Sequence, residues 1–115
     1  MTNDLHFLSL AEAAALIRTR QLSPVTYTEA LLQRIDEFEP QLNAFISLTA
    51  NQVMDDAKRA EQEITSGTYR GPLHGIPYAI KDIIDVAGVP TTANSHILSD
   101  NIPSEDATVV AKLRD

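Results

Sequence analysis

The middle of the chain reads Gly71-Pro72-Leu73-His74-Gly75-Ile76-Pro77-Tyr78-Ala79-Ile80-Lys81-Asp82. Its first half is dense in glycine and proline, which favour turns. Its second half is almost continuously apolar, which is typical of a strand buried on both faces. We therefore predict a turn that leads into a buried strand over residues 78–80, with Lys81 and Asp82 at the end of that strand.

Lys81 stands out because of where such a strand would leave it. An amine at the end of a buried strand loses hydration, which favours its neutral form, and a neutral lysine can act as a general base or a nucleophile. A nearby carboxylate, such as that of Asp82 or Asp85, would instead hold the amine charged, and the residues alone do not decide between these effects. The competing interpretation is a lysine whose charged group reaches solvent past apolar neighbours.

Amphipathic helices are predicted before this stretch. Ser9 and Glu12 form a capping box, and apolar residues at helical spacing then indicate a first helix over residues 10–19. Ser23 followed by Pro24 marks the start of a second helix, because serine caps a helix and proline suits its first position.

The second helix is expected to end at Pro40. Residues 42–48 then form an apolar run too short for periodicity to separate a strand from a buried turn of helix. Thr49 and Gln52 repeat the capping-box pattern, and Gly67 suits the C-terminal cap of a third helix. One face of that helix is expected to hold Val53, Ala57, Ala60 and Ile64.

The last part of the chain is predicted to be a polar loop followed by one more helix. Residues 104–106 are typical of its start, and Val109, Val110 and Leu113 would form its apolar face. The helical pattern is still running at Asp115, so we expect a truncated chain. One strand cannot form a sheet by itself, so its partners should lie beyond this chain or on another one.

The composition excludes several classes of protein. The 115 residues suffice for one small domain, and a net charge of −7 argues against a nucleic-acid partner, because neutralising phosphates requires clustered Lys and Arg. There is no cysteine, and His6, His74 and His96 are scattered, so we predict no disulfide, metal or cofactor. Neither a signal peptide nor a membrane-spanning run is present, so we expect a cytoplasmic protein.

The stretch and its continuation resemble the lysine-bearing segment of the amidase-signature family. The resemblance continues from Asp82 into Asp85-Val86-Ala87-Gly88-Val89-Pro90-Thr91-Thr92. Three further segments look like the N-terminal region of the same family: Leu22-Ser23-Pro24, Leu42-Asn43-Ala44-Phe45 and Asp106-Ala107-Thr108-Val109-Val110. The resemblance therefore covers almost the whole chain, from about residue 8 to residue 113.

This resemblance implies an α/β fold in which a mixed β-sheet is enclosed by helices. It implies that residues 1–115 are the N-terminal part of a single amidase domain, apparently truncated, which supplies mainly helices plus a buried strand. It also implies a hydrolase that converts a non-peptide amide into a carboxylic acid plus ammonia or an amine with a Ser–cis-Ser–Lys triad. In that triad Lys81 would relay a proton through the cis-serine to the nucleophilic serine.

Both serines of the triad lie well downstream of the lysine in the family, within a Gly/Ser-rich segment. This chain has no such segment, and its four glycines all lie at or before Gly88. Ser95 and Ser99 are loop serines and are not expected to replace the nucleophile. Lys81 is thus the one catalytic residue predicted here, and the chain alone is expected to be inactive.

Three other residues receive structural predictions. His74 is expected to form hydrogen bonds that hold the turn, and Tyr78 is expected to pack in the core. Asn94 stands where members of the family often have a glycine or a small residue. Asparagine tolerates a left-handed backbone, so the turn there is expected to survive.

Alternative functions stay open. The A-type subunit of a glutamine-dependent aminoacyl-tRNA amidotransferase has a similar N-terminal region, although Asp85-Val86-Ala87-Gly88 is closer to general amidases. A non-catalytic interaction module would account for the acidic charge and the missing serines. A Schiff-base lysine enzyme ranks lower, because no phosphate-binding glycine loop accompanies Lys81.

The partners expected of an amidase follow from the same features. We predict a small-molecule amide substrate, no nucleic acid and no membrane. We also expect self-association or pairing with the missing remainder of the enzyme, because an unpaired strand exposes backbone groups and apolar surface.

Overall fold

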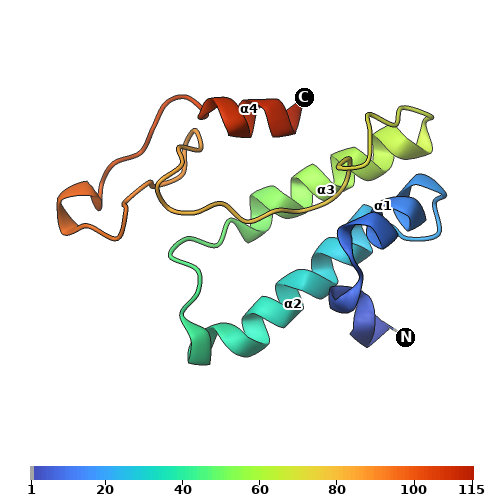
Figure 1. Cartoon of the computed structure of the whole chain (residues 1–115), viewed down its shortest axis with the longest axis horizontal. Coiled ribbons are helices and arrows are strands. Elements are labelled where there is room, and N and C mark those ends of the chain that lie inside the picture. The colour runs from blue at the N-terminus through green and yellow to red at the C-terminus, as the bar shows by residue number, and fades with distance from the viewer. Residues whose placement is uncertain (1) are drawn as a thin grey trace. The chain divides into compact units, whose positions relative to one another are not determined.

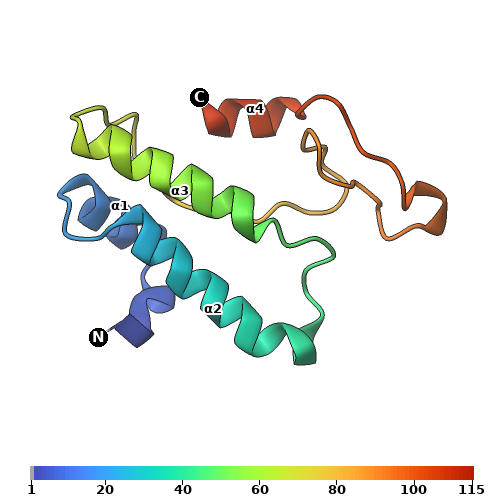
Figure 2. The same ribbon diagram turned by 180° about the vertical axis from the view of Figure 1, so that it is seen from behind.

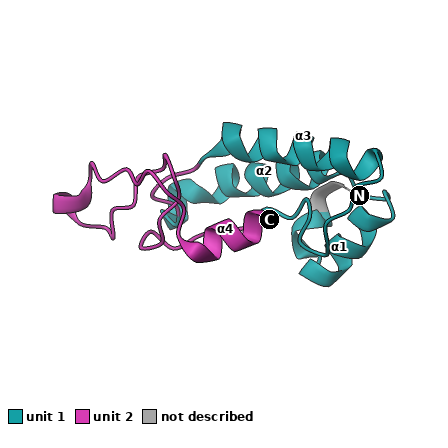
Figure 3. Ribbon diagram, turned by 90° about the horizontal axis from the view of Figure 1, so that it is seen from above, with its two compact units in different colours: residues 1–44, 49–77 teal, residues 45–48, 78–115 magenta. Residues whose placement is uncertain are grey.

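The computed structural model describes residues 2–115, with side chains described from residue 4 onward. The elements are η1 (Thr2–Phe7), α1 (Leu10–Arg18), α2 (Pro24–Leu42), α3 (Ala50–Thr65), η2 (His96–Leu98) and α4 (Thr108–Arg114) (Figure 1). The chain divides into two compact units (Figure 3). Unit 1 comprises Met1–Ala44 and Thr49–Pro77, and unit 2 comprises Phe45–Leu48 and Tyr78–Asp115.

The core of unit 1 lies between its helices. α2 and α3 run side by side, as the two opposite views in Figures 1 and 2 show. Ile17 of α1 is 1 % exposed, and Ala13 one turn before it is fully buried. The other buried members of the same cluster are Leu22, Tyr27 and Ile64. The amphipathic pattern of the sequence therefore converges on one small apolar core.

The predicted start of α1 and that of α2 are both confirmed by side-chain caps. In α1, Ser9 Oγ accepts a hydrogen bond from Glu12 N at 3.3 Å, and Glu12 Oε2 accepts one from Ser9 N at 2.8 Å, which completes the capping box. In α2, Ser23 Oγ accepts hydrogen bonds from the backbone N–H groups of Val25 and Thr26. Pro24 occupies the first helical position.

The predicted end of the second helix at Pro40 is wrong, because α2 continues to Leu42. Proline removes one backbone donor from the helix ladder, yet so close to the C-terminus few further bonds depend on it. The ladder resumes at Asn43, whose N–H donates to Glu39 O at 2.8 Å. Asn43 then adopts φ 48° and ends the helix in the left-handed conformation that asparagine tolerates.

The third helix agrees with the prediction in its buried face and its end. Ala57, Ala60 and Ile64 are buried in α3, whereas Val53 is only partly buried. At the C-terminus Thr68 N donates to Glu63 O and Gly67 N donates to Ile64 O, with Gly67 at φ 100°. These two bonds form a Schellman motif, so the expected glycine cap is confirmed.

The predicted capping box at the start of the third helix is wrong. Thr49 occupies the N-cap position, but its side chain makes no capping hydrogen bond. Its backbone at φ −89° and ψ 52° departs from the extended conformation that normally directs a capping hydroxyl at the first turn. Of residues 42–48, for which both strand and helix were open, Leu42 is the last residue of α2, while residues 43–48 form neither, and Ile46 and Leu48 are exposed.

The strand predicted over residues 78–80 is also wrong for the part of the chain that the structure describes. A strand exists only through hydrogen bonds to a neighbouring strand, and residues 78–80 have no such ladder. Among residues 2–115 the β-type pairing is one isolated bridge, Val86 to Val89. The side chain of Tyr78 is 48 % exposed, so its expected place in the core is wrong as well. Mainly helical structure is confirmed.

Unit 2 is built from loops that bond to one another without forming a sheet. Gly88 N donates to Pro103 O at 2.9 Å. Thr91 N donates to Asn101 O, and the Asn101 side-chain amide donates back to Thr91 O, each at 2.9 Å. Thr91 is buried by this exchange. These bonds tie the segment after Lys81 to the segment before α4.

The last helix begins later than residues 104–106, at Thr108. Asp106 explains the delay, because its side chain is used elsewhere: Oδ1 accepts a hydrogen bond from Ala87 N at 2.8 Å, and Oδ2 lies 3.1 Å from Arg114 Nε. Of the predicted apolar face, Val110 is 1 % exposed, while Val109 and Leu113 are exposed. No helix among the described residues is long and apolar enough to cross a membrane.

Candidate active site

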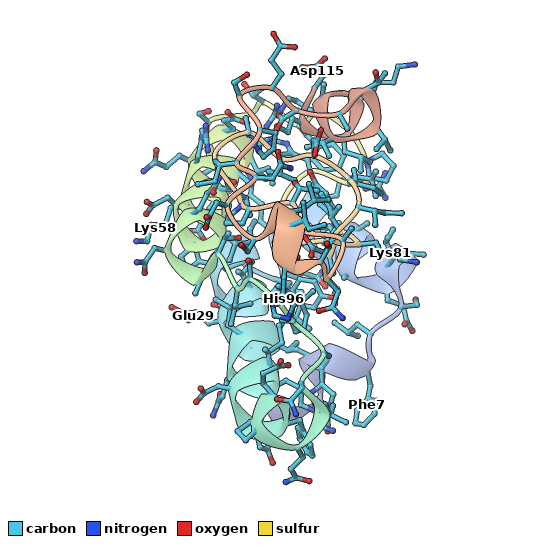
Figure 4. The ribbon with its side chains drawn as sticks, turned by 90° about the vertical axis from the view of Figure 1, so that its left-hand side faces the viewer. Phe7, Glu29, Lys58, Lys81, His96 and Asp115 are labelled. Carbon is cyan, nitrogen blue, oxygen red and sulfur yellow. The ribbon has the colours of Figure 1, made fainter. Side chains whose placement is uncertain are left out.

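Lys81 lies in unit 2, just after the boundary with unit 1. Its side chain is exposed (Figure 4). Its backbone is fixed by a tight turn, because Lys81 O accepts hydrogen bonds from Ile83 N at 2.8 Å and Ile84 N at 3.0 Å. The described residues therefore fix the backbone of Lys81 and leave its side chain exposed to solvent.

Asp82, the next residue, bonds to a single turn ten residues further along the chain. Its Oδ1 accepts a hydrogen bond from Thr92 N at 2.9 Å, and its Oδ2 accepts one from the Thr92 hydroxyl. Asn94 N also donates to Oδ2, at 3.4 Å. Asp82 O accepts a further bond from Ala93 N at 2.8 Å. We call this set of contacts the Asp82 clamp.

The turn that the clamp holds has an uncommon backbone. Ser95 N donates to Thr92 O at 2.8 Å, and the two residues between them, Ala93 and Asn94, have φ values of 48° and 54°. Two successive left-handed residues define a turn of type I′. The expectation that Asn94 preserves the turn is confirmed, while Ala93 adopts the same conformation with a side chain that disfavours it.

The clamp makes Asp82 a stronger acid. Hydrogen bonds from the Thr92 side chain and backbone, and more weakly from Asn94 N, lower the pKa of Asp82 below its ordinary value of 3.8, against a smaller opposing effect of desolvation. A carboxyl with a lowered folded-state pKa stabilises the fold above its ordinary pKa, and this contribution is lost as the pH falls through the folded-state pKa.

Acidification is therefore expected to release the clamp below pH 3.8. The amide resonances of Thr92 and Asn94 should shift together in ¹H–¹⁵N spectra, with a midpoint below that value, and Asp82→Asn should abolish the shift. The amide of Gly88, which donates to a carbonyl instead of a carboxylate, is the internal control. A midpoint at or above 3.8 would contradict the geometry of the clamp.

His74 lies in unit 1 with both ring nitrogens engaged. Nδ1 accepts a hydrogen bond from Arg70 N at 3.2 Å, so in the neutral ring the proton is on Nε2. Nε2 lies 2.8 Å from Glu63 Oε2, and the Arg70 guanidinium lies 3.0 Å from the same oxygen. The His74 ring is buried, and these contacts anchor the turn after residue 70 to α3. This geometry favours the predicted structural role.

The two loop serines, Ser95 and Ser99, form hydrogen bonds with residues three positions earlier in the chain. Ser99 Oγ donates to His96 O at 3.0 Å, and the backbone of Ser95 closes the turn above. Among the described residues there is also no group of three or more His, Asp or Glu side chains that could hold a metal ion. The candidate site in this chain thus consists of Lys81 and the Asp82 clamp.

The sequence identified Lys81 but missed Thr92 as the partner of Asp82. No local pattern joins an aspartate to a threonine ten positions later, because the contact depends on how the intervening loop folds back. The one available signal was Asn94, a residue that tolerates positive φ, which already indicated a turn at this place.

A model of the family described as Amidase matches residues 26–115. The chain belongs to the amidase family. An acylamidase of Rhodococcus erythropolis is 40 % identical over 111 residues, which cover 96 % of this chain and 23 % of the acylamidase. The A-type subunit of the glutamyl-tRNA(Gln) amidotransferase of Carboxydothermus hydrogenoformans is 38 % identical over 112 residues, covering 97 % of this chain and 23 % of that protein.

Among solved structures, the peptide amidase PAM in complex with the competitive inhibitor chymostatin superposes with a TM-score of 0.85 at 37 % identity. The match covers 92 % of this amidase-family chain and 22 % of that structure. The chain therefore spans less than a quarter of the length of these relatives. Both units, including Lys81 and the Asp82 clamp, fall largely within the matched family region.

Proposed function

We propose that residues 1–115 are the N-terminal part of a single amidase domain, and that the full-length protein hydrolyses a linear amide with Lys81 as its proton relay. The observation that carries this proposal is the segment from Gly71 to Thr92, which has the lysine-bearing pattern of the family and lies inside the matched region. The relatives named acylamidase and peptide amidase support amide hydrolysis as the reaction class.

The mechanism divides between this chain and polypeptide that follows it. A serine hydroxyl is a weak nucleophile until a base takes its proton. In the proposed triad the nucleophilic serine passes its proton through a cis-serine to the neutral Lys81 amine and attacks the amide carbon. Backbone N–H groups stabilise the tetrahedral oxyanion, the amine leaves with a proton, and water then releases the acid from the acyl-enzyme.

Lys81 must lose hydration to perform this role. Its side chain is exposed in the described structure. Burial by the remainder of the domain would favour the neutral, proton-accepting form. We propose that the same remainder covers the exposed apolar side chains of unit 2, among them Tyr78, Ile83 and Ile102. The coding sequence that follows Asp115 tests whether such a remainder exists. A Gly/Ser-rich continuation would support the amidase, since a non-catalytic interaction module needs none.

The proposed reaction is tested with the full-length protein and a series of linear amides. We expect release of a carboxylic acid and ammonia or an amine by the protein alone, with no partner protein added. The same protein is offered glutamine as the control substrate. Absence of hydrolysis across aliphatic, aromatic and peptide amides would contradict the proposal.

A second candidate is the A-type subunit of an amidotransferase that takes ammonia from glutamine. Its support is that a relative carrying that name, in Chloroflexus aurantiacus, reaches 42 % identity, the same value as a relative named putative amidase in Mycobacterium tuberculosis. Glutaminase activity that appears only when a partner protein is added would favour this candidate over the amidase.

A further inference from the structure

Asp82 places most of its hydrogen-bonding capacity on one turn. Three of its contacts come from side-chain oxygens and the fourth from its carbonyl, and all of them reach Thr92, Ala93 or Asn94. A carboxylate that only solubilised the surface would be hydrated instead. The concentration of contacts indicates that the position of this turn relative to residue 82 is fixed by several bonds at once.

The turn needs such support because its backbone is strained. Ala93 at φ 48° adopts a left-handed conformation that costs a residue with a Cβ about 1–2 kcal/mol. Strained residues of this kind persist where surrounding contacts over-determine them, and they cluster at functional sites. The N–H of Ala93 donates to Asp82 O, and the N–H of Asn94 is shared between Thr92 Oγ1 at 3.1 Å and Asp82 Oδ2 at 3.4 Å, so Asp82 and Thr92 together hold the strained pair.

The clamp acts one residue away from Lys81. The carbonyl of Lys81 is itself bound twice, by Ile83 N and Ile84 N. Backbone on the C-terminal side of Lys81 is therefore fixed by its own turn and by the clamp. The direction of the Cα–Cβ bond of Lys81 depends on that backbone, and a flexible four-carbon side chain reaches a defined point only if its origin is fixed.

We propose that Asp82, through its clamp on the Thr92–Ser95 turn, is the positioning residue for Lys81, aligning the lysine amine for proton transfer without itself touching the substrate. This inference rests on the proposed function and deepens it. The competing interpretation is that Asp82 stabilises unit 2 in general and affects activity only through folding. The two differ in whether the effect of Asp82 requires Lys81 to be present.

The test uses the full-length enzyme and a double-mutant cycle. Asp82→Ala removes the side-chain acceptors, and we expect kcat to fall on the order of a hundred-fold, as misplacement of a reacting group by about 1 Å can cause. KM should change less than about three-fold, because the lost interaction is one of alignment. In the Lys81→Ala background, measured at high enzyme concentration, the same substitution should have no further effect.

Thr92 supplies a second, milder probe in case Asp82→Ala does not fold. Thr92→Val keeps the shape of the side chain and loses the hydroxyl, which donates to Asp82 and accepts from Asn94 N at 3.1 Å, so we expect a smaller loss of kcat. Thr92→Ser keeps the hydroxyl and should restore kcat to within about two-fold of the wild type.

Asp106→Asn is the matched control. Asp106 is another carboxylate of unit 2 that accepts a backbone hydrogen bond, but its partners are Ala87 and Arg114. The Asp106→Asn substitution should lower the melting temperature without changing kcat by more than about two-fold. Two results would overturn the positioning role. The first is that Asp82→Ala lowers kcat by the same factor whether or not Lys81 is present. The second is that Asp82→Ala has the kcat of the wild type. Full activity of Lys81→Ala itself would remove the proposed function and this inference together.

Discussion

Replacement of Lys81 by alanine in the full-length enzyme should lower kcat by at least about a thousand-fold, with the melting temperature unchanged. The magnitude follows from triads that act as a unit, in which removal of the base disables the nucleophile as well. Units 1 and 2 should fold as before, because within the described residues the side chain of Lys81 is exposed and packs against no buried core. Steady-state kinetics with the best linear amide, and thermal melting of the same preparation, measure both quantities.

Two further variants sharpen this test. Lys81→Arg keeps a positive charge, but a guanidinium does not give up its proton near neutral pH, so this variant should be as inactive as the alanine variant. Lys112→Ala removes an exposed lysine of α4 in the same unit and should keep full activity. Near-normal turnover in Lys81→Ala would refute the proton-relay role.

Gly75→Ala should destabilise unit 1 by about 2–5 kcal/mol. A Cβ built on Gly75 would lie 2.9 Å from Pro24 Cγ and 3.1 Å from Pro24 Cβ, so α2 or the turn must shift. Overpacking of this kind costs about 1–3 kcal/mol. The backbone of Gly75 at φ 84° adds a left-handed penalty of about 1–2 kcal/mol for any residue with a Cβ.

The matched control for this substitution is Gly67→Ala. Gly67 also has a positive φ in unit 1, but a Cβ there meets no atom within 4 Å. The difference between the two variants therefore isolates the collision with Pro24 from the backbone penalty. Urea unfolding followed by circular dichroism at 222 nm, at one fixed protein concentration, gives both values. Equal destabilisation by the two substitutions would show that the packing of Gly75 on Pro24 is not what limits stability.

The parts of the fold that the sequence predicted are those encoded by neighbours along the chain. The helix caps have partners within four residues along the chain, so the local sequence is enough to recognise them. They are Ser9 with Glu12, Ser23 with Pro24, and Gly67. Pro40 misleads because the cost of proline depends on how many helix bonds follow it, and here the helix ends two residues later.

The parts that failed depend on distant or absent partners. An apolar run such as residues 78–80 indicates a strand only if another strand bonds to it, and the described residues contain none. The start of the last helix is displaced because Asp106 bonds to Ala87. For the candidate site, a motif identified Lys81, whereas the partnership of Asp82 with Thr92 requires a folded loop and could not be predicted from spacing.

The twelve residues from Gly71 to Asp82 cross the boundary between the two units, which lies after Pro77. Selection therefore acts on the two halves of this motif in different ways. Substitutions near His74 and Gly75 change how much folded protein a cell maintains, and a stabilising change elsewhere in unit 1 can compensate for them. If Lys81 and Asp82 have the roles proposed above, substitutions there change what each folded molecule can do, and a gain in stability elsewhere does not restore that activity. In one contiguous motif, a loss of stability can thus be compensated by substitutions elsewhere in the protein, whereas a loss of activity cannot.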